Sequence, residues 1–104
     1  MTRAHVIGMG RLGTHLAQRL EALDIEVTRW NRTPRDGARD LSEWTPDDHP
    51  DAVFLTVSDD ALDPLVTSLS GQLEPDTWLI HHAGSVSREV LKAAGCETAV
   101  LWPP

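Results

Sequence analysis

Ala4-His5-Val6-Ile7-Gly8-Met9-Gly10-Arg11-Leu12-Gly13 joins a short apolar run to three glycines spaced G-x-G-x-x-G. The pattern is weak alone, but here it follows an apolar strand and opens an amphipathic helix, the context of a phosphate-binding turn. In such a turn the first glycine permits the tight bend, the second lets a pyrophosphate approach the backbone, and the third lets the helix pack closely. Leucines at helical spacing predict one apolar stripe on this helix, which should begin near Arg11: Leu12, Leu16, Leu20 and Leu23.

Beyond this turn the chain alternates β-rich runs with helical patterns, which predicts a parallel sheet with crossover helices. Strands are expected at residues 4–7, 26–30, 52–57, 77–81 and 98–102, with helices from about 11, over 61–69 and from 85 or 87 to 94. Residues 38–44 should form a short helix or an irregular third strand, 31–34 should be a loop, and 46–50 should be a turn. The prediction is one α/β domain over residues 1–104, a three-layer Rossmann-type fold with a mainly parallel, doubly wound sheet.

The residues that end the second strand indicate which dinucleotide is preferred. About 20 residues after the glycine turn, an NAD-binding domain places Asp or Glu on the ribose hydroxyls. This chain has Trp30-Asn31-Arg32-Thr33 there. Arg32 can fork onto phosphate oxygens, and Asn31 and Thr33 can donate neutral hydrogen bonds. We therefore expect NADP rather than NAD as the cofactor.

Four arginines fall within eleven positions of an otherwise acidic chain: Arg29, Arg32, Arg35 and Arg39. This grouping indicates a local anion site, with Arg11 and Arg35 as secondary candidates. The alternative is a solvated loop that exchanges ion pairs with Asp36 and Asp40. The net charge of −7 argues against nucleic-acid binding, which needs a basic face.

Compartment and membrane association can also be predicted from composition. No apolar run approaches the roughly 20 residues that a membrane span needs. The single cysteine, Cys96, excludes an internal disulfide framework and fits a reducing cytosol. A cytoplasmic protein that binds neither membrane nor nucleic acid is expected.

Three segments resemble the N-terminal domains of β-hydroxyacid dehydrogenase-type reductases: residues 8–13, 31–33 and 51–62. That group includes 6-phosphogluconate dehydrogenase, pyrroline-5-carboxylate reductase and the deazaflavin-dependent NADP reductases. The chain is most similar to an uncharacterised branch of Rossmann-like proteins with an all-helical C-terminal domain. That branch has His-x-Ser-Gly after the fifth strand and His-Pro after the sixth, where this chain has His81-His82-Ala83-Gly84 and Trp102-Pro103.

The resemblance implies an NADP(H)-binding domain of an oxidoreductase that acts on a small molecule. In the resembled families the loop after the fourth strand passes near the cofactor's ribose and nicotinamide, although Ser58 and Asp59 also suit a helix cap. The expected cofactor-binding residues are Gly8, Met9, Gly10, Arg11, Leu12, Gly13, Asn31, Arg32, Thr33, Val57, Ser58 and Asp59. The families add a helical substrate domain, often with a dimer interface, that residues 1–104 lack. This chain alone is therefore expected to bind cofactor without turnover, and a homodimer would form through that further domain.

His81 and His82 are the candidate catalytic residues, because they end the fifth strand where ligands of open α/β sheets bind. A neutral imidazole there could exchange the proton that accompanies hydride transfer. At most one of the two should point into the cleft, since successive strand residues face opposite ways. The alternative is that both bond only to backbone or water at the strand end.

The remaining histidines show no metal-ligand spacing and are expected at the surface or in packing: His5, His15 and His49. No metal site is predicted. A second class of function is a non-catalytic nucleotide sensor that regulates a partner, because the fold alone does not decide activity. A Rossmann methyltransferase is a weaker third class, since Asn31-Arg32 offers no carboxylate to an adenosine ribose.

Overall fold

The computed structural model describes residues 2–33, 37–44, 50–57, 59–69, 72–81 and 97–100 of the chain. The described strands are β1 (Arg3–Ile7), β2 (Glu26–Asn31), β3 (Arg39–Asp40), β4 (Ala52–Leu55), β5 (Trp78–His81) and β6 (Glu97–Val100). The helices are α1 (Arg11–Ala22) and α2 (Asp59–Leu69), with a 3₁₀ turn, η1, at Leu41–Glu43. The strands form one sheet in the order β3-β2-β1-β4-β5-β6, and each of these pairings is parallel.

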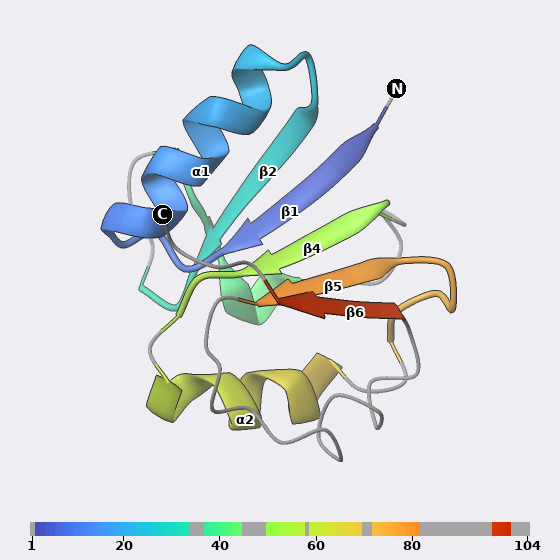
Figure 1. Cartoon of the computed structure of the whole chain (residues 1–104). Coiled ribbons are helices and arrows are strands. Elements are labelled where there is room, and N and C mark those ends of the chain that lie inside the picture. Colours follow the sequence, from blue (N-terminus) through green and yellow to red (C-terminus); the bar gives the residue numbers. More distant parts are fainter. Residues whose placement is uncertain are drawn as a thin grey trace.

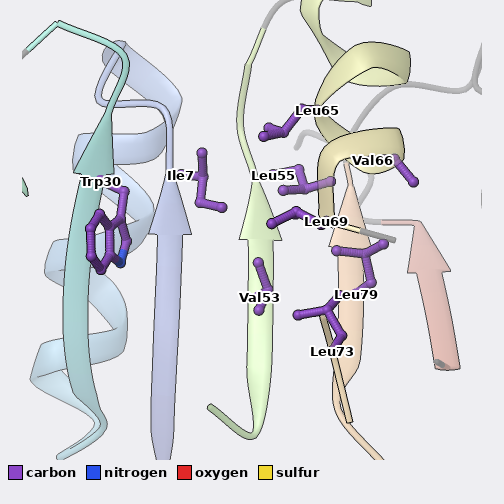
Figure 2. Packing of buried hydrophobic residues seen from close by; sticks show 9 residues of the cluster. All are labelled: Ile7, Trp30, Val53, Leu55, Leu65, Val66, Leu69, Leu73 and Leu79. Atoms are coloured by element: carbon purple, nitrogen blue, oxygen red, sulfur yellow. The ribbon is translucent and has the colours of Figure 1, made fainter. Parts of the chain in front are cut away.

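The two helices cover opposite faces of this sheet, which confirms the predicted three-layer, doubly wound α/β fold (Figure 1). Alternation along the strands sends successive side chains to opposite faces. On the α2 face, Leu55 and Leu79 pack with Leu65 of the helix (Figure 2). On the other face, Val6 of β1 packs with Ala17 of α1.

The predicted apolar stripe of α1 is wrong at its last member. The helix ends at Ala22, and Leu23 is its C-cap residue with 71% of its surface exposed. Asp24 then takes a left-handed backbone conformation, with φ of 62°, as the chain turns towards β2. A leucine beyond the last helical residue no longer follows the helical period, so the spacing could not keep Leu23 on the buried face.

The segment expected as a short helix or an irregular strand contains both. β3 pairs only two residues with β2, and η1 follows it directly. Asp40 caps η1 by accepting hydrogen bonds from the Ser42 backbone N–H at 3.0 Å and from its hydroxyl at 2.8 Å. These two bonds hold the pKa of the Asp40 carboxyl below its usual value, and the bond from the Ser42 backbone N–H has the larger effect.

Several predicted boundaries shift by a few residues. Asn31, expected in a loop, is the last residue of β2. Strand β4 ends at Leu55 rather than 57, and α2 begins at Asp59 rather than 61. Strand β5 begins at Trp78 and β6 at Glu97, each one residue from its expected start. Residues 46–49 of the expected turn, the expected helix at 85–94 and residues 101–102 lie outside the described residues.

Strand β4 is covered less evenly than its apolar sequence predicts. Val53 and Leu55 are fully buried on the α2 face, but Ala52 and Phe54 on the other face are only half-buried. On that other face α1 lies over β1 and β2 (Figure 1), and Trp78 at the start of β5 keeps 48% of its surface exposed. Within the described part of the chain, β4 is therefore fully covered on the α2 face and only partly covered on the α1 face.

Candidate functional site

The first and third glycines of the turn are required by close approach of the backbone. Gly8 has φ of 103°, a conformation that favours glycine, and a Cβ there would lie 2.7 Å from the Thr56 carbonyl oxygen. A Cβ on Gly13 would lie 1.8 Å from the Gly8 carbonyl oxygen. These contacts give both glycines the structural roles that the motif predicts: a tight turn, and close packing of α1.

The middle glycine differs, because it borders open space. Gly10 is the exposed N-cap residue of α1, and a Cβ there would meet no atom within 4 Å. Its φ of −73° and ψ of −165° are accessible to any residue, so the fold does not demand glycine here.

The N-terminus of α1 is open to an anion. None of the described side chains caps it, and its first turn contains no acidic residue. The first N–H groups of a helix lack intrahelical partners and carry a partial positive charge, which together favour phosphate.

Thr56 fixes the glycine turn through hydrogen bonds to its backbone. Its buried hydroxyl lies 2.7 Å from the carbonyl oxygen of Gly8 and 3.1 Å from that of Ile7, and donates to them. Its backbone N–H also donates to the Ile7 carbonyl at 2.9 Å. The first residue after β4 thus fixes the end of β1 and the start of the turn.

Replacing Thr56 with valine should lower the free energy of unfolding by about 1–3 kcal/mol, because the shape is kept while a buried carbonyl loses its donor. Urea denaturation measures the change. Thr28→Val is the matched control, since the half-buried Thr28 hydroxyl makes no hydrogen bond within the described residues. Equal losses in the two variants would show that the Thr56 hydroxyl does not hold the turn.

A cleft of about 570 Å³ opens at the carboxyl ends of β1 and β4. These strands are neighbours in the sheet, and the chain leaves them towards opposite faces, to α1 and α2 (Figure 1). Such a switch point is where open α/β sheets bind ligands. The described residues that line it are Ile7, Gly8, Met9, Gly10, Asn31, Arg32, Leu41, Thr56, Val57, Pro64 and Leu65.

The lining gives this cleft a positive character. Arg32 is its one charged side chain among the described residues, and no carboxylate is present there. Arg32 is exposed and makes no hydrogen bond or ion pair with any described residue. It also borders a second recess of about 360 Å³, which contains Asp40. The Asp40 carboxylate is engaged by Ser42, so Arg32 is the group available to an anion in the cleft.

The Asn31 side chain, predicted to act beside Arg32, has hydrogen-bond partners of its own. Asn31 accepts a hydrogen bond from the Met9 backbone N–H through Oδ1, at 3.0 Å. Its Nδ2 donates to the Thr33 carbonyl oxygen at 2.6 Å. The side chain of Thr33 is exposed, outside the lining of the cleft.

The arginine cluster does not act as one unit. Arg29 pairs with Glu21 of α1, and the Arg39 guanidinium lies 5.7 Å from the centre of the Trp30 ring. Arg11 is exposed and borders a shallow depression beside the glycine turn. The alternative interpretation requires ion pairs with Asp36 and Asp40; no such pair with Asp40 is present among the described residues, and Arg35 and Asp36 lie outside them. Among the described arginines of the cluster, Arg32 is the one that lines the cleft.

The remaining predicted cofactor residues are placed unevenly. Met9 is buried, and Val57 is half-buried in the cleft wall. Leu12 is half-buried on α1, away from the cleft lining. Asp59 begins α2, but its side chain, like all of Ser58, lies outside what is described.

His81 lies in the core and is not among the residues that line the cleft. It is 2% exposed and stands in register with Leu55 of β4 and Val100 of β6. Residues in register share a face of the sheet, so His81 lies on the α2 face. His82 lies outside the described residues. The catalytic role of both histidines stays a prediction.

Five cleft residues lie outside the predicted set: Ile7, Leu41, Thr56, Pro64 and Leu65. Thr56 carried a signal, because it is the polar residue of the apolar run 52–57. Leu41 reaches the cleft through a distant contact: Trp44 Nε1 donates to Nδ1 of buried His5 at 2.9 Å, which fixes η1 against β1. No local sequence pattern predicts that contact.

The described residues contain neither a cluster of metal ligands nor a membrane-spanning helix. No three His, Cys, Asp or Glu side chains come together there as a set of metal ligands. None of the described helices is both long and apolar enough to span a bilayer.

Comparison with models of known families and with curated proteins finds no match for this chain. Solved structures do share its fold. A protein assigned as an NADP oxidoreductase, BF3122 from Bacteroides fragilis, matches 99% of the chain with a TM-score of 0.80 and 24% identity. The imine reductase of Streptomyces aurantiacus matches 93% of the chain with a TM-score of 0.62 and 25% identity. RSP, solved in complex with β-NADH, matches 97% of the chain with a TM-score of 0.72 and 13% identity.

These likenesses show that the chain has a Rossmann-type α/β fold. RSP is described as a Rex-family repressor, so the fold is shared by oxidoreductases and by a regulator. The chain spans 44%, 40% and 53% of the three solved proteins' own lengths. The activity of a whole protein is therefore a matter for proposal.

Proposed function

We propose that this chain is the NADP(H)-binding domain of an oxidoreductase that acts on a small molecule. One observation carries the proposal: the N-terminus of α1 and the Arg32 side chain, neither of which is bonded to a described side chain, border one cleft whose described lining has no carboxylate. The helix end suits the pyrophosphate that NAD and NADP share. Arg32 suits the 2′-phosphate that only NADP carries.

The residues present fit such a cofactor. Open space above Gly10 admits a group close to the backbone, and Ile7, Val57 and Leu65 give the cleft apolar walls. When bound, a nicotinamide dinucleotide would supply or accept the hydride, while the protein binds and orients it. Asn31 and Thr56 act on the turn itself, because they fix the Met9 N–H and the Gly8 carbonyl.

Several finer features belong to the same proposal. A cytoplasmic location agrees with the single cysteine. Arg32 is the titratable side chain of the described cleft lining, so a catalytic acid or base would come from other residues of the complete protein. A homodimer would form through a further helical domain, which the greater length of the solved relatives supports.

Calorimetric titration should show that NADP⁺ binds more tightly than NAD⁺. Arg32→Ala should weaken NADP⁺ binding by about 1.5–3 kcal/mol, the strength of a charge-assisted hydrogen bond, which is roughly ten- to hundredfold in Kd. NAD⁺ binding should change little. Arg19→Ala, at an exposed position in the last turn of α1, is the control for loss of one positive charge.

Each outcome of this titration is informative. Equal affinities for the two dinucleotides in the unsubstituted chain would refute the choice of NADP. Failure to bind either would refute the binding function. For the complete protein, NADPH oxidation with a panel of imines, ketones and 2-oxo acids separates an oxidoreductase from a nucleotide sensor.

A further inference from the structure

Asn31 joins two loops that border the same cleft. Its Oδ1 accepts from the Met9 N–H at 3.0 Å, and its Nδ2 donates to the Thr33 carbonyl at 2.6 Å. Both partners are backbone groups, and they are 24 residues apart in sequence. The orientation of the amide follows from its partners, because an N–H requires an oxygen and a carbonyl requires an N–H donor.

This side chain acts where the regular sheet ends. The Gly8 N–H donates to the Trp30 carbonyl at 2.8 Å, and this is the last backbone bond between the end of β1 and β2. One residue further on, the Asn31 side chain replaces the backbone as the partner of Met9. The bond therefore extends the ladder by one step and restrains the peptide that leads into Gly10.

The second bond restrains the segment that carries Arg32. Arg32 stands between Asn31 and Thr33, and the bond from Nδ2 closes these residues into a short turn. Arg32 has no partner of its own among the described residues, so its placement depends on this turn.

We infer that Asn31 is a positioning residue that couples the pyrophosphate part of the cleft to the 2′-phosphate part. This inference rests on the proposed function. Asn31 acts through Met9 and Arg32, so its amide serves the cofactor chiefly by holding the two loops together. An aspartate could accept from Met9, but it could not donate to Thr33 and would place a negative charge beside Arg32.

The test is a double-mutant cycle read out by NAD⁺ and NADP⁺ titration. Asn31→Ala should weaken the binding of NAD⁺ about fivefold and that of NADP⁺ at least tenfold, because the loops that contact both phosphate groups lose their restraint. The effect of Arg32→Ala on NADP⁺ should shrink to under about threefold in the Asn31→Ala background. Asn31→Asp should recover NAD⁺ binding but not NADP⁺ binding, because it keeps the acceptor for Met9.

Amide hydrogen exchange in the ligand-free chain supplies a second measurement. The Met9 N–H should exchange faster in Asn31→Ala than in the unsubstituted chain, and slowly again in Asn31→Asp. Unchanged NAD⁺ binding in Asn31→Ala, together with a full effect of Arg32→Ala on NADP⁺ binding in both backgrounds, would overturn this inference but leave the proposed function standing. Failure of the unsubstituted chain to bind either dinucleotide would overturn the proposed function and this inference with it.

Discussion

Gly13→Ala should lower the free energy of unfolding by about 3 kcal/mol or more, at the upper end of the cost of overpacking. The added Cβ would lie 1.8 Å from the Gly8 carbonyl oxygen and 2.5 Å from the Thr56 hydroxyl. Neither atom can yield cheaply: Gly8 is held in a left-handed conformation, and Thr56 hydrogen-bonds to that carbonyl. Helix α1 must therefore move away from β1, although alanine itself favours helix by about 1 kcal/mol over glycine.

Chemical denaturation measures this loss, and Gly10→Ala is the matched control. The same methyl group at Gly10 meets no atom within 4 Å. Its cost should stay within about 1 kcal/mol, the difference between glycine and alanine as N-cap residues. If Gly13→Ala proves as stable as Gly10→Ala, α1 does not depend on close contact with the turn.

Gly10→Val should abolish measurable binding of both NADP⁺ and NAD⁺ while the chain stays folded. The valine side chain would project into the open space over the N-terminus of α1, where the pyrophosphate should lie. A branched side chain there would keep the phosphate from the helix N–H groups, so the binding of both dinucleotides should be lost to the same extent. Arg32→Ala, in contrast, should affect only NADP⁺.

Titration calorimetry measures the loss of binding, and circular dichroism confirms retained folding. Ala22→Val, at the exposed end of α1, is the control for an added valine in this helix. Normal binding by a folded Gly10→Val variant would mean that the glycine turn is only a structural bend.

The parts of the fold that sequence predicts correctly have local causes. The strand, glycine turn and helix follow from positions 4–13, because the left-handed Gly8 and the crowded Gly13 act over a few residues. The parallel order follows from the alternation of strands and helices along the chain. Their distance from the turn predicts Asn31 and Arg32 as cofactor-binding residues, and both line the cleft.

The features that sequence did not predict depend on contacts between distant residues. β3 has only two paired residues, too few for any period, and its position follows from pairing with β2. Leu41 reaches the cleft because Trp44 bonds to His5, 39 residues away. The sequence predicts that Asn31 bonds directly to the ligand, whereas its bond to the Met9 N–H depends on two loops that only the fold brings side by side.

The placement of Arg32 has an evolutionary consequence. Its side chain is exposed and bonds to none of the described residues, whereas Gly8, Gly13 and Thr56 are tied to one another beneath the turn. Natural selection could therefore alter the residue at position 32 with little loss of folding, while the turn below stays under strong constraint. Descendants of such a domain can diverge in ligand preference more quickly than in architecture.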